Sequence, residues 1–383
     1  MTVFSVRLGD IAVQITDGIH LSPKYVEEGI PMLDSKHIGN DFSIDDLSAE
    51  KFITKETDEQ LAKRCKPMAG DILISSRGTI GKIAIVKDNQ NFNIMGNMIL
   101  IRLGDDIDKR YFLHYLKQSM SHLIGLARGV AQKGLYLNQV RDLRIQLPKI
   151  EKQKYIAVLL DTADNVLRLR EQAIAKLDEL AQSVFIEMFG NPILNTKNIQ
   201  TKSVKEICKL INGRAFKPTE WRDSGMPIIR IQNLNDESKS FNFTDQIFDE
   251  KYLVKKGDIL FSWSGTPGTS FGCFKWMREN GWLNQHIFKI QLNEREVLPD
   301  FFIMQMNLKI GELIAQAHGG VGLQHVTKGM VDDLVLLIPS MADQIKFCER
   351  LNRITDGKNI CFVSLQKCKS MHQSLQHQSF AVN

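Results

Sequence analysis

A glycine-rich turn at residues 75–82 carries the side chains that are best suited to chemistry. Its sequence, SSRGTIGK, offers three hydroxyl groups, a guanidinium and an amine within eight positions. Such a turn could hold a phosphate group, but a nucleotide-binding loop requires glycine at its first position and Ser or Thr after the lysine. Ser76 and Ile83 stand at those two positions. Nucleotide binding is therefore not the predicted chemistry of this turn.

A second turn, SWSGTPGTS at residues 262–270, has a similar composition but contains no lysine. Both turns are rich in hydrogen-bond donors and acceptors, which are the groups that contact base edges and phosphates in DNA. Gly/Ser/Thr turns also occur in β-rich domains for structural reasons. Trp263 could equally be a packing residue. Both interpretations stay open for each single residue.

The sequence lacks the residue patterns of enzymes that modify or cut DNA. An amino-methyltransferase needs an (Asn/Asp)-Pro-Pro-aromatic loop, but the chain has no Pro-Pro pair and no glycine fingerprint for S-adenosylmethionine. A nuclease needs carboxylates around a metal ion, and no acidic-x-Lys sequence follows Pro299-Asp300 at a suitable distance. The six cysteines form no CxxC pair and no zinc-type cluster with histidine. We expect no catalysis, metal or cofactor in this chain.

The elements that position the two turns are repeated along the chain. The period is about 190 residues, which is too long for a solenoid and indicates a duplicated unit. In both copies GDIL leads into a glycine-rich turn, and a later Leu-Pro or Ile-Pro precedes a glutamine by five positions. The matching pairs are GIPML at 29–33 and GMPII at 225–229, GDILIS at 70–75 and GDILFS at 257–262, NIMGNMILIRL at 93–103 and WLNQHIFKIQL at 282–292, and VRDLRIQLP at 140–148 and VDDLVLLIP at 331–339.

Each copy is predicted to be a mixed α+β domain that is rich in strands. The short β-branched runs and glycine turns at residues 70–86 are typical of a strand hairpin. Residues 98–103 and 287–292 predict buried strands. Residues 108–127 and 299–317 predict one amphipathic helix in each copy.

A long helix is predicted after the first domain. Between Gln153 and Phe189 there is no Pro or Gly, and Gly190-Asn191-Pro192 then ends the helix. Ten positions recur at alternating spacings of four and three residues, and all but one are apolar, which indicates a coiled-coil seam. They are Ile156, Leu160, Ala163, Leu167, Arg170, Ile174, Leu177, Ala181, Val184 and Met188.

The segment after the second domain carries a weaker seam. Lys358 and His372 interrupt it, and Gly357 lowers the helix propensity. If the two copies are related by a pseudo-two-fold axis, the helices should pair antiparallel; the alternative is that each helix packs onto its own domain. The apolar seam positions are Phe347, Leu351, Ile354, Cys361, Leu365, Cys368 and Leu375.

The chain of 383 residues is therefore predicted to contain a first domain at 1–148, a central helix at 149–190, a second domain at 191–339 and a C-terminal helix at 340–383. The net charge of +5 permits nucleic-acid binding without requiring it. No apolar run approaches the ~20 residues of a membrane span. The N-terminus has no signal-peptide pattern, so a cytoplasmic location is expected.

The two GDIL turns, the proline–glutamine junctions and the long helices resemble the specificity subunit of type I restriction–modification systems. Residues 135–192 are the most family-like stretch, and the resemblance covers the whole chain. It implies two target-recognition domains that each read one half of a bipartite DNA site, and two helices that hold these domains apart. It also implies two modification subunits, which bind the helices and methylate adenine, and restriction subunits that can join them. S-adenosylmethionine, ATP and Mg²⁺ would belong to those partners, with no role for a membrane.

Candidate DNA contacts lie at equivalent places in the two copies. The two sets differ while their frames match, as expected for domains that read different half-sites of double-stranded DNA. The first copy offers Lys36, His37, Ser75, Ser76, Arg77, Thr79, Lys82, Lys133 and Tyr136. The second offers Arg230, Gln232, Asn233, Ser262, Trp263, Ser264, Thr266, Thr269, Gln324, His325 and Lys328.

Two other functions remain as alternatives to DNA recognition. A coiled-coil adaptor that binds only proteins would explain the helices, but not two strand-rich domains with polar turns. A stand-alone DNA-modifying enzyme would need the catalytic motifs that are absent from the sequence. Sequence-specific DNA binding, measured with and without a modification subunit, separates these functions.

Overall fold

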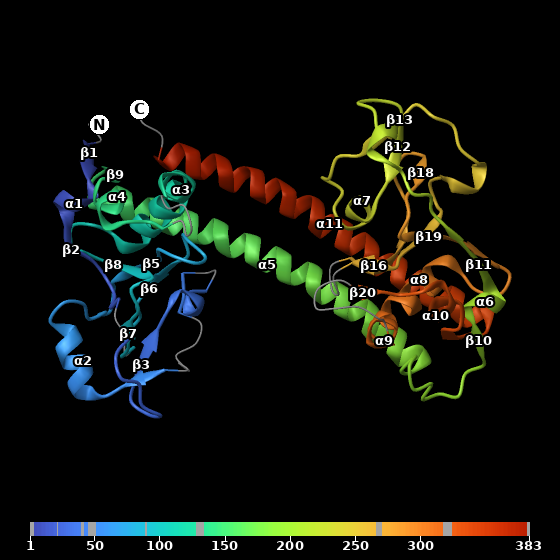
Figure 1. Ribbon diagram of the computed structural model, residues 1–383, viewed down its shortest axis with the longest axis horizontal. Helices are drawn as coiled ribbons and strands as arrows, with labels where there is room; N and C mark the ends of the chain where they lie inside the picture. Colours follow the sequence, from blue (N-terminus) through green and yellow to red (C-terminus); the bar gives the residue numbers. More distant parts are fainter. Residues whose placement is uncertain are drawn as a thin grey trace. The chain divides into compact units, whose positions relative to one another are not determined.

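The computed structural model describes residues 4–20, 22–39, 42–44, 51–88, 90–127, 134–265, 270–316 and 324–380. The protein divides into two compact units, shown in Figure 1. Unit 1 comprises residues 1–170 and 364–383, and unit 2 comprises residues 171–363. The long helices α5 (Ile150–Phe189) and α11 (Met341–Phe380) each contribute residues to both units.

Unit 1 is built on an antiparallel four-stranded sheet with the order β2-β8-β5-β6. Along β5, Ile72 and Ile74 join the core beneath helix α3, whereas Leu73 joins the core of a second sheet, β4-β3-β7. The strand is buried on both faces, which explains its unbroken run of apolar residues. The elements are β1 (Phe4–Arg7), α1 (Leu8–Ile11), β2 (Ala12–Asp17), β3 (Ile30–Leu33), η1 (Ser35–His37), β4 (Phe52–Ile53), α2 (Lys55–Ala62), β5 (Ile72–Ser75), β6 (Ile83–Ile85), β7 (Asn93–Ile94), β8 (Met98–Leu103), α3 (Lys109–Leu126), α4 (Leu137–Arg141) and β9 (Arg144–Leu147).

Unit 2 repeats this plan with the sheet β11-β19-β15-β17. Phe261 of β15 joins the core beneath helix α8, and its neighbour Leu260 faces the second sheet, β13-β12-β18-β14. The elements are β10 (Thr201–Ser203), α6 (Val204–Ile207), β11 (Cys208–Asn212), η2 (Pro218–Glu220), β12 (Met226–Ile229), α7 (Ile231–Asn235), β13 (Asn242–Thr244), η3 (Glu250–Tyr252), β14 (Leu253–Val254), β15 (Ile259–Ser262), β16 (Ser264–Gly265), β17 (Gly272–Lys275), β18 (Gly281–Leu283), β19 (Ile287–Leu292), α8 (Pro299–Leu308), α9 (Ile310–Gln316), β20 (Gln324–His325), α10 (Lys328–Asp332) and β21 (Val335–Leu337).

The helices and sheets of both units confirm the predicted α+β class. The internal repeat also extends to individual glycines. A Cβ atom at Gly18 would lie 2.3 Å from the Ile94 carbonyl oxygen, and one at Gly213 would lie 1.9 Å from that of Asn284. Because no side chain fits so close to a backbone oxygen, both positions require glycine for the same reason. The two copies therefore share their backbone packing as well as their sequence pattern.

A buried glutamine fastens each long helix to the domain that precedes it. Gln153 accepts a hydrogen bond from the Asp108 amide at 2.9 Å and donates to the Pro148 carbonyl at 2.9 Å. Gln344 makes the same pair of bonds, to the Leu298 amide at 2.9 Å and the Pro339 carbonyl at 3.1 Å. Both side chains are buried, so these contacts satisfy groups that water cannot reach.

The two long helices run antiparallel within each unit. In unit 1, Phe380 of α11 packs with Ile156 and Leu160 of α5; in unit 2, Phe347 of α11 packs with Phe185 and Phe189 of α5. Every apolar position of the predicted seams is buried or half-buried. Each unit thus contains segments of both helices, which rules out separate packing of each helix on its own domain. None of the helices in the described ranges is long and apolar enough to span a membrane.

The polar interruptions of the second seam face carboxylates on α5. Lys358 pairs with Asp178 in unit 2, and the His372 ring nitrogen Nε2 lies 2.9 Å from Asp164 Oδ1 in unit 1. Gly357 lies inside α11 without breaking it. The helix that the sequence predicts to be irregular is thus one continuous helix of 40 residues.

The prediction of a single helix over residues 299–317 is wrong, because this segment contains two helices. The chain forms two helices, α8 and α9, with a break at Lys309. The Lys309 side chain is buried, and its amine donates to the carbonyl oxygens of Val335 at 2.8 Å and Pro192 at 3.4 Å. The same amine lies 3.2 Å from Glu312 Oε2, so this buried cation is paired as well as hydrogen-bonded, and an unpaired amine inside the unit would be costly.

A histidine–aspartate contact joins α3 to α5 in unit 1. The buried His114 ring has Nε2 at 2.7 Å from Asp161 Oδ1, and Arg110 donates to the same carboxylate. Burial lowers the pKa of His114, and the hydrogen bond with Asp161 offsets only part of this effect. Burial alone would raise the pKa of Asp161, but hydrogen bonds and charges from Arg110 and His114 outweigh it and lower the pKa.

Candidate nucleic-acid interface

The turn between β5 and β6 is held from inside by a serine. The buried Ser75 hydroxyl donates to the Thr79 carbonyl at 2.6 Å and accepts a bond from the Lys82 amide at 2.8 Å. Gly78 and Gly81 adopt positive φ angles of 72° and 93°, which favour glycine. The result is a tight turn whose Arg77 and Thr79 side chains are exposed.

Ser76 is the junction that brings separate segments of unit 1 to this turn. Its amide donates to the Asn97 carbonyl at 2.8 Å, and its carbonyl accepts from the Leu135 amide at 2.9 Å. Arg77 and the half-exposed Tyr136 therefore line one pocket of about 440 Å³, although they are far apart in sequence. The pocket brings together a guanidinium and a phenol, which are both able to contact DNA.

The other candidates in unit 1 divide between exposed and buried positions. Lys36 is exposed, one residue after Ser35, which accepts a hydrogen bond from Asn97. His37 is buried, and its Nδ1 accepts a bond from the Asp34 amide at 3.0 Å, so it caps the local turn. Lys82 donates to the Ile38 carbonyl at 2.7 Å, which ties its amine to the protein backbone.

The described ends of the matching turn in unit 2 carry different side chains. The buried Ser262 hydroxyl donates to the Ser270 carbonyl, as Ser75 does to Thr79. Trp263 takes the place of Ser76: its amide donates to the His286 carbonyl at 3.2 Å, and its carbonyl accepts from the Val326 amide at 3.1 Å. The indole ring stacks on Phe288 with centroids 5.6 Å apart, so it has a packing role in this turn.

Further candidates in unit 2 lie on two neighbouring segments. Arg230 lies over the Trp221 ring at 5.7 Å, and the exposed Gln232 donates to the Ser240 carbonyl at 3.2 Å. Asn233 is buried and caps α7 by accepting from the Arg230 amide at 3.1 Å. The exposed Lys328 has its amine 3.9 Å from Asp332. Arg230, Gln232 and Lys328 are therefore the accessible polar groups of this set.

The remaining candidates are placed only in part. Ser264 is buried on β16 and pairs in register with His325 on β20, and Gly265 pairs with Gln324. Lys133, Thr266 and Thr269 lie outside the described residues. In the described ranges, the accessible candidates thus number fewer than the sequence predicts, because the serines, His37 and Asn233 shape the turns from within.

Two polar residues near the turns were missed by the sequence reasoning. His20 lines the Arg77 pocket and has Nε2 at 2.5 Å from Asp17 Oδ2. Arg214 lies over the rings of Phe216 at 4.9 Å and Phe248 at 4.1 Å. Both follow the equivalent glycines Gly18 and Gly213, so extending the internal alignment through those glycines would have found them.

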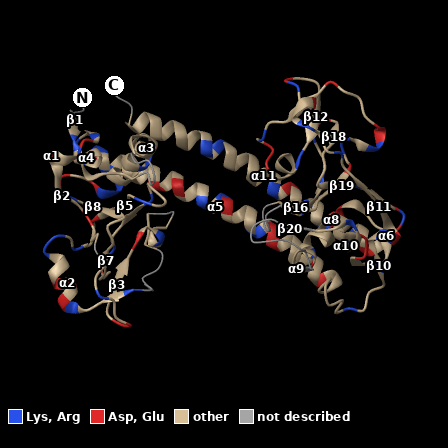
Figure 2. Ribbon diagram, viewed as in Figure 1, with Lys and Arg blue, Asp and Glu red and all other residues tan. Residues whose placement is uncertain are grey.

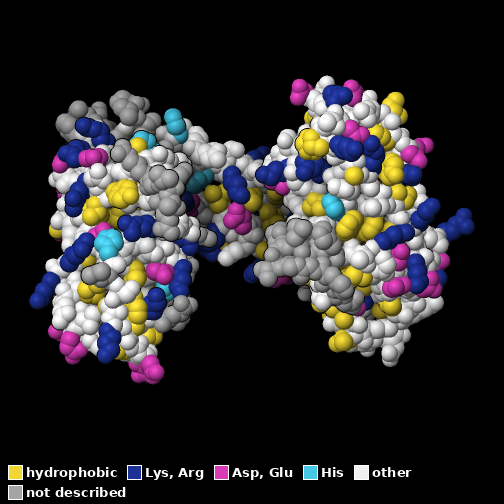
Figure 3. All heavy atoms as spheres, viewed as in Figure 1, with side chains coloured by type: hydrophobic (Ala, Val, Ile, Leu, Met, Phe, Trp, Pro, Cys, Tyr) yellow, Lys and Arg dark blue, Asp and Glu magenta, His cyan; other side chains and the backbone are white. Residues whose placement is uncertain are grey.

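Lys and Arg residues are distributed over both units and are mixed with Asp and Glu (Figure 2). On the face shown in Figure 3, basic side chains gather on both units beside small apolar patches. Such a mixed surface can supply phosphate contacts at several points without a single strongly basic groove.

The sequence matches a family model described as the type I restriction modification DNA specificity domain. The model matches twice, at residues 3–179 and 196–360. A putative type I restriction enzyme specificity subunit, MjaX, of Methanocaldococcus jannaschii is 24% identical over 375 residues, covering 91% of this chain and 86% of the relative. The EcoBI specificity subunit of Escherichia coli is 31% identical over 171 residues, covering 43% of this chain and 35% of the relative.

Two solved structures share the fold. The S subunit of a type I restriction–modification system from M. genitalium aligns with a TM-score of 0.56 and 13% identity, covering 100% of this chain and 97% of that one. A chain from a structural study of complex assembly and conformational transition in the type I R-M system aligns with a TM-score of 0.58 and 15% identity, covering 99% and 97%. Both likenesses extend over the two units and the helices.

Proposed function

Because this chain belongs to the DNA specificity family of type I restriction–modification systems, we propose that each unit reads one half of a bipartite site in double-stranded DNA. The chain is a non-catalytic specificity subunit with two recognition domains. The observation that carries the proposal is the pair of matching junctions at Ser76 and Trp263, which make equivalent backbone hydrogen bonds while the polar groups beside them differ. Equivalent frames with different side chains suit two half-sites of different sequence.

The burial of each candidate suggests its part in recognition. In unit 1, the candidates with exposed side chains are Arg77, Thr79, Lys36 and Tyr136, and these are proposed to reach bases or phosphates. Ser75 instead holds the turn that presents them. A guanidinium is the side chain most often used to read guanine, so Arg77 is the proposed base-reading residue of unit 1.

The helices α5 and α11 are the proposed spacer and docking platform. An uninterrupted helix of 40 residues extends roughly 60 Å at 1.5 Å per residue, and this length would set the unread gap in the DNA. Both helices keep large apolar side chains exposed outside their seam, including Tyr155, Val158 and Leu169 on α5, and Ile360 and Phe362 on α11. Exposed apolar groups of this kind mark protein contacts, and two modification subunits would dock there.

The chemistry of the complex would lie in the partner subunits. Modification subunits would bring S-adenosylmethionine, and restriction subunits, where present, would bring ATP-dependent and Mg²⁺-dependent cleavage. This chain would then supply the recognition of the DNA sequence, the spacing between the half-sites and the surface on which the subunits assemble. A cytoplasmic location fits this role.

Domain exchange tests the proposal. Residues 1–148 would be replaced by the matching domain of a relative, the hybrid co-expressed with its modification subunit, and the methylated sites mapped by genome-wide methylation sequencing. One half of the methylated site should change, while the other half and the gap stay the same. A change in both halves at once would contradict modular reading, and folded protein without any DNA binding would favour the protein-only adaptor.

A further inference from the structure

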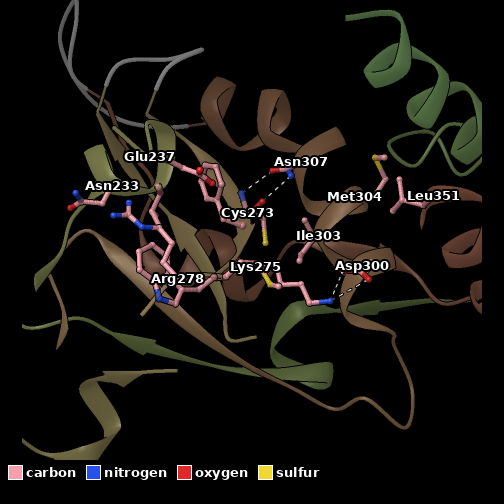
Figure 4. Close-up of a pocket in the computed structure, with 14 residues that line it drawn as sticks. Asn233, Glu237, Cys273, Lys275, Arg278, Asp300, Ile303, Met304, Asn307 and Leu351 are labelled. Carbon is pink, nitrogen blue, oxygen red and sulfur yellow. Dashed lines mark hydrogen bonds and ion pairs between the residues drawn. The ribbon is translucent and has the colours of Figure 1, made fainter. Parts of the chain in front are cut away.

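Unit 2 contains an open groove between the edge strand β17 and helix α8. Its volume is about 430 Å³, within the ~300–1,000 Å³ typical of binding pockets. Ile303 and Met304 of α8 and Leu351 of α11 supply apolar lining, and the Lys275–Asp300 ion pair lies at the groove (Figure 4). Asn307 clamps the Cys273 backbone by donating to its carbonyl at 3.0 Å and accepting from its amide at 2.8 Å.

The equivalent groove of unit 1 is filled by an aromatic side chain. Phe42 is buried there, with its ring 5.6 Å from the His114 ring in an edge-on contact. Arg110 and Lys117 lie over the same ring, at 5.5 Å and 5.3 Å from its centroid. The Phe42 carbonyl also accepts a hydrogen bond from the Ile85 amide at 3.0 Å, so its backbone extends the edge of the sheet.

The strand register shows that the two grooves are equivalent. Ile85 pairs with Ile72 on β5, and Lys275 pairs with Ile259 on β15, at the same place in the repeated GDIL segment. The Asp108 and Leu298 amides are equivalent because each binds the buried glutamine of its unit. His114 and Met304 lie six residues after these amides, so they correspond to each other. The groove beside Met304 is therefore the counterpart of the site that Phe42 fills.

Among the described residues of unit 2, the matching loop lines the groove with Leu234 and Glu237 but places no aromatic side chain in it. Alignment through the two caps, at His37 and Asn233, places Ser238 at the position of Phe42. Ser238 is exposed and its hydroxyl donates to Asp236 at 2.6 Å. The described residues give the Lys275 amide no backbone partner outside the sheet, in contrast to Ile85. An apolar slot thus lies beside the Lys275 amide, while Asn307 already occupies the Cys273 part of the strand edge.

We propose that this groove receives an aromatic side chain on an extended segment of the modification subunit, whose backbone accepts a hydrogen bond from the Lys275 amide of β17. The recognition mode is one backbone hydrogen bond at a strand edge with an anchoring aromatic side chain, as Phe42 shows within this same chain. Leu351 makes the groove continuous with α11, the helix assigned above to docking, and the exposed Met277 adds apolar surface at its rim. The identity of this partner rests on the proposed function.

Methionine methyl NMR on the full chain tests the proposal. The chain would be labelled with ¹³C-methyl methionine, the Met304 signal assigned with Met304→Leu, and purified modification subunit added. A bound aromatic ring should shift the Met304 methyl signal upfield through its ring current. As a second probe, a peptide copying residues 38–46, IGNDFSIDD, should shift the same signal, whereas its copy with Ala in place of Phe should not.

A groove-filling variant gives an independent readout. Met304→Trp should weaken binding of the modification subunit by about tenfold or more, while Ile247→Trp, at an exposed site of the same unit, should leave it unchanged. Thermal unfolding of both variants checks that the fold is retained. If Met304→Trp does not fold, the methyl shift of the unmodified chain decides the question.

The outcomes separate this inference from the proposed function. A complex that forms while the Met304 methyl signal stays in place overturns the groove assignment and leaves the specificity function intact. Failure of the unmodified chain to bind any modification subunit overturns the proposed function and, with it, the named occupant. A shift that depends only on the concentration of this chain would assign the groove to a second copy instead and overturn the proposal.

Discussion

Lys358 of α11 and Asp178 of α5 form an ion pair within the helix seam of unit 2, with Nζ 2.6 Å from Oδ1. A charged residue at a seam position fixes which partner faces it, because a shifted register would leave the charge beside apolar groups. The pair is partly exposed, so its contribution lies in register more than in stability.

Reversing this charge should have a measurable and recoverable effect. Lys358→Glu should destabilise the chain by about 1 kcal/mol, since two carboxylates would then face each other. The double change Lys358→Glu with Asp178→Lys should recover most of the loss in a urea-unfolding cycle. Equal stability of the single and double variants would show that the two side chains do not interact.

The buried His114 should make unit 1 sensitive to mild acid. Its pKa is lowered in the folded chain by burial, so the unfolded chain binds a proton more readily than the folded one. Its contribution to stability is therefore complete above about pH 6.5 and is lost as the pH falls below that value. After correction for the intrinsic exchange rate, which itself slows in acid, the protection of the α3 amides should decrease between about pH 7 and pH 5.

The variant His114→Met, which copies the equivalent residue Met304 of unit 2, should flatten this pH dependence. His122→Gln changes an exposed histidine of the same helix and is the matched control. An unchanged pH dependence in His114→Met would assign the effect to other groups.

The fastening glutamines should be energetically costly to remove. Gln153→Ala leaves the Asp108 amide and the Pro148 carbonyl without their side-chain partner, which should destabilise unit 1 by about 2 kcal/mol. Gln344→Ala should have a similar effect in unit 2. Gln182→Ala, at an exposed position of α5, should change stability by less than about 0.5 kcal/mol. A loss no larger than this control would mean that water replaces both bonds.

Arg77→Ala should weaken recognition of one half-site. If Arg77 reads a guanine, the loss should be about 1–3 kcal/mol and should depend on the base at one position. If it contacts only phosphate, the loss should be uniform across sequences and the salt dependence shallower. Binding to a library of half-site variants measures both, with the exposed Arg144→Ala as the control. No change of either kind would leave the turn with a structural role.

Lengthening the helices should lengthen the unread gap. One heptad inserted after Asp178 and one after Lys358, which face each other, would keep the seam in register. Seven residues add about 10 Å at 1.5 Å per residue, or about three base pairs at 3.4 Å each. Methylation mapping should find both half-sites unchanged and the gap longer. A lengthened protein that assembles but keeps the original gap would restrict the helices to docking.

The periodic features of this fold could be predicted from the sequence. The seam of α5 and the strands at 98–103 and 287–292 follow from local spacing, and each is confirmed. The roles of Gln153 and Gln344 could not be predicted, because the amide that each one binds lies 45 or 46 residues away. A polar side chain looks the same in sequence whether it faces solvent or closes a turn from inside.

The candidate interface illustrates the same limit. Ser75, Ser262 and Asn233 have suitable chemistry for DNA contacts, yet their burial depends on where distant segments pack. The burial of Lys309 likewise involves carbonyl groups of Val335 and Pro192, which lie far from it in the sequence. Whether these residues touch DNA remains a prediction for the experiments above.

The place of Phe380 in unit 1 has a consequence for synthesis on the ribosome. Tyr111, Ile156 and Leu160 bury their apolar surface against this residue, but residues 171–363 of unit 2 are made before it. At roughly 5–20 residues per second, that delay is on the order of 10–40 s. During this time the nascent unit 1 leaves this apolar surface exposed to water while unit 2 is synthesised. Unit 1 is therefore completed after unit 2, which is the reverse of the order in which the two units begin to be translated.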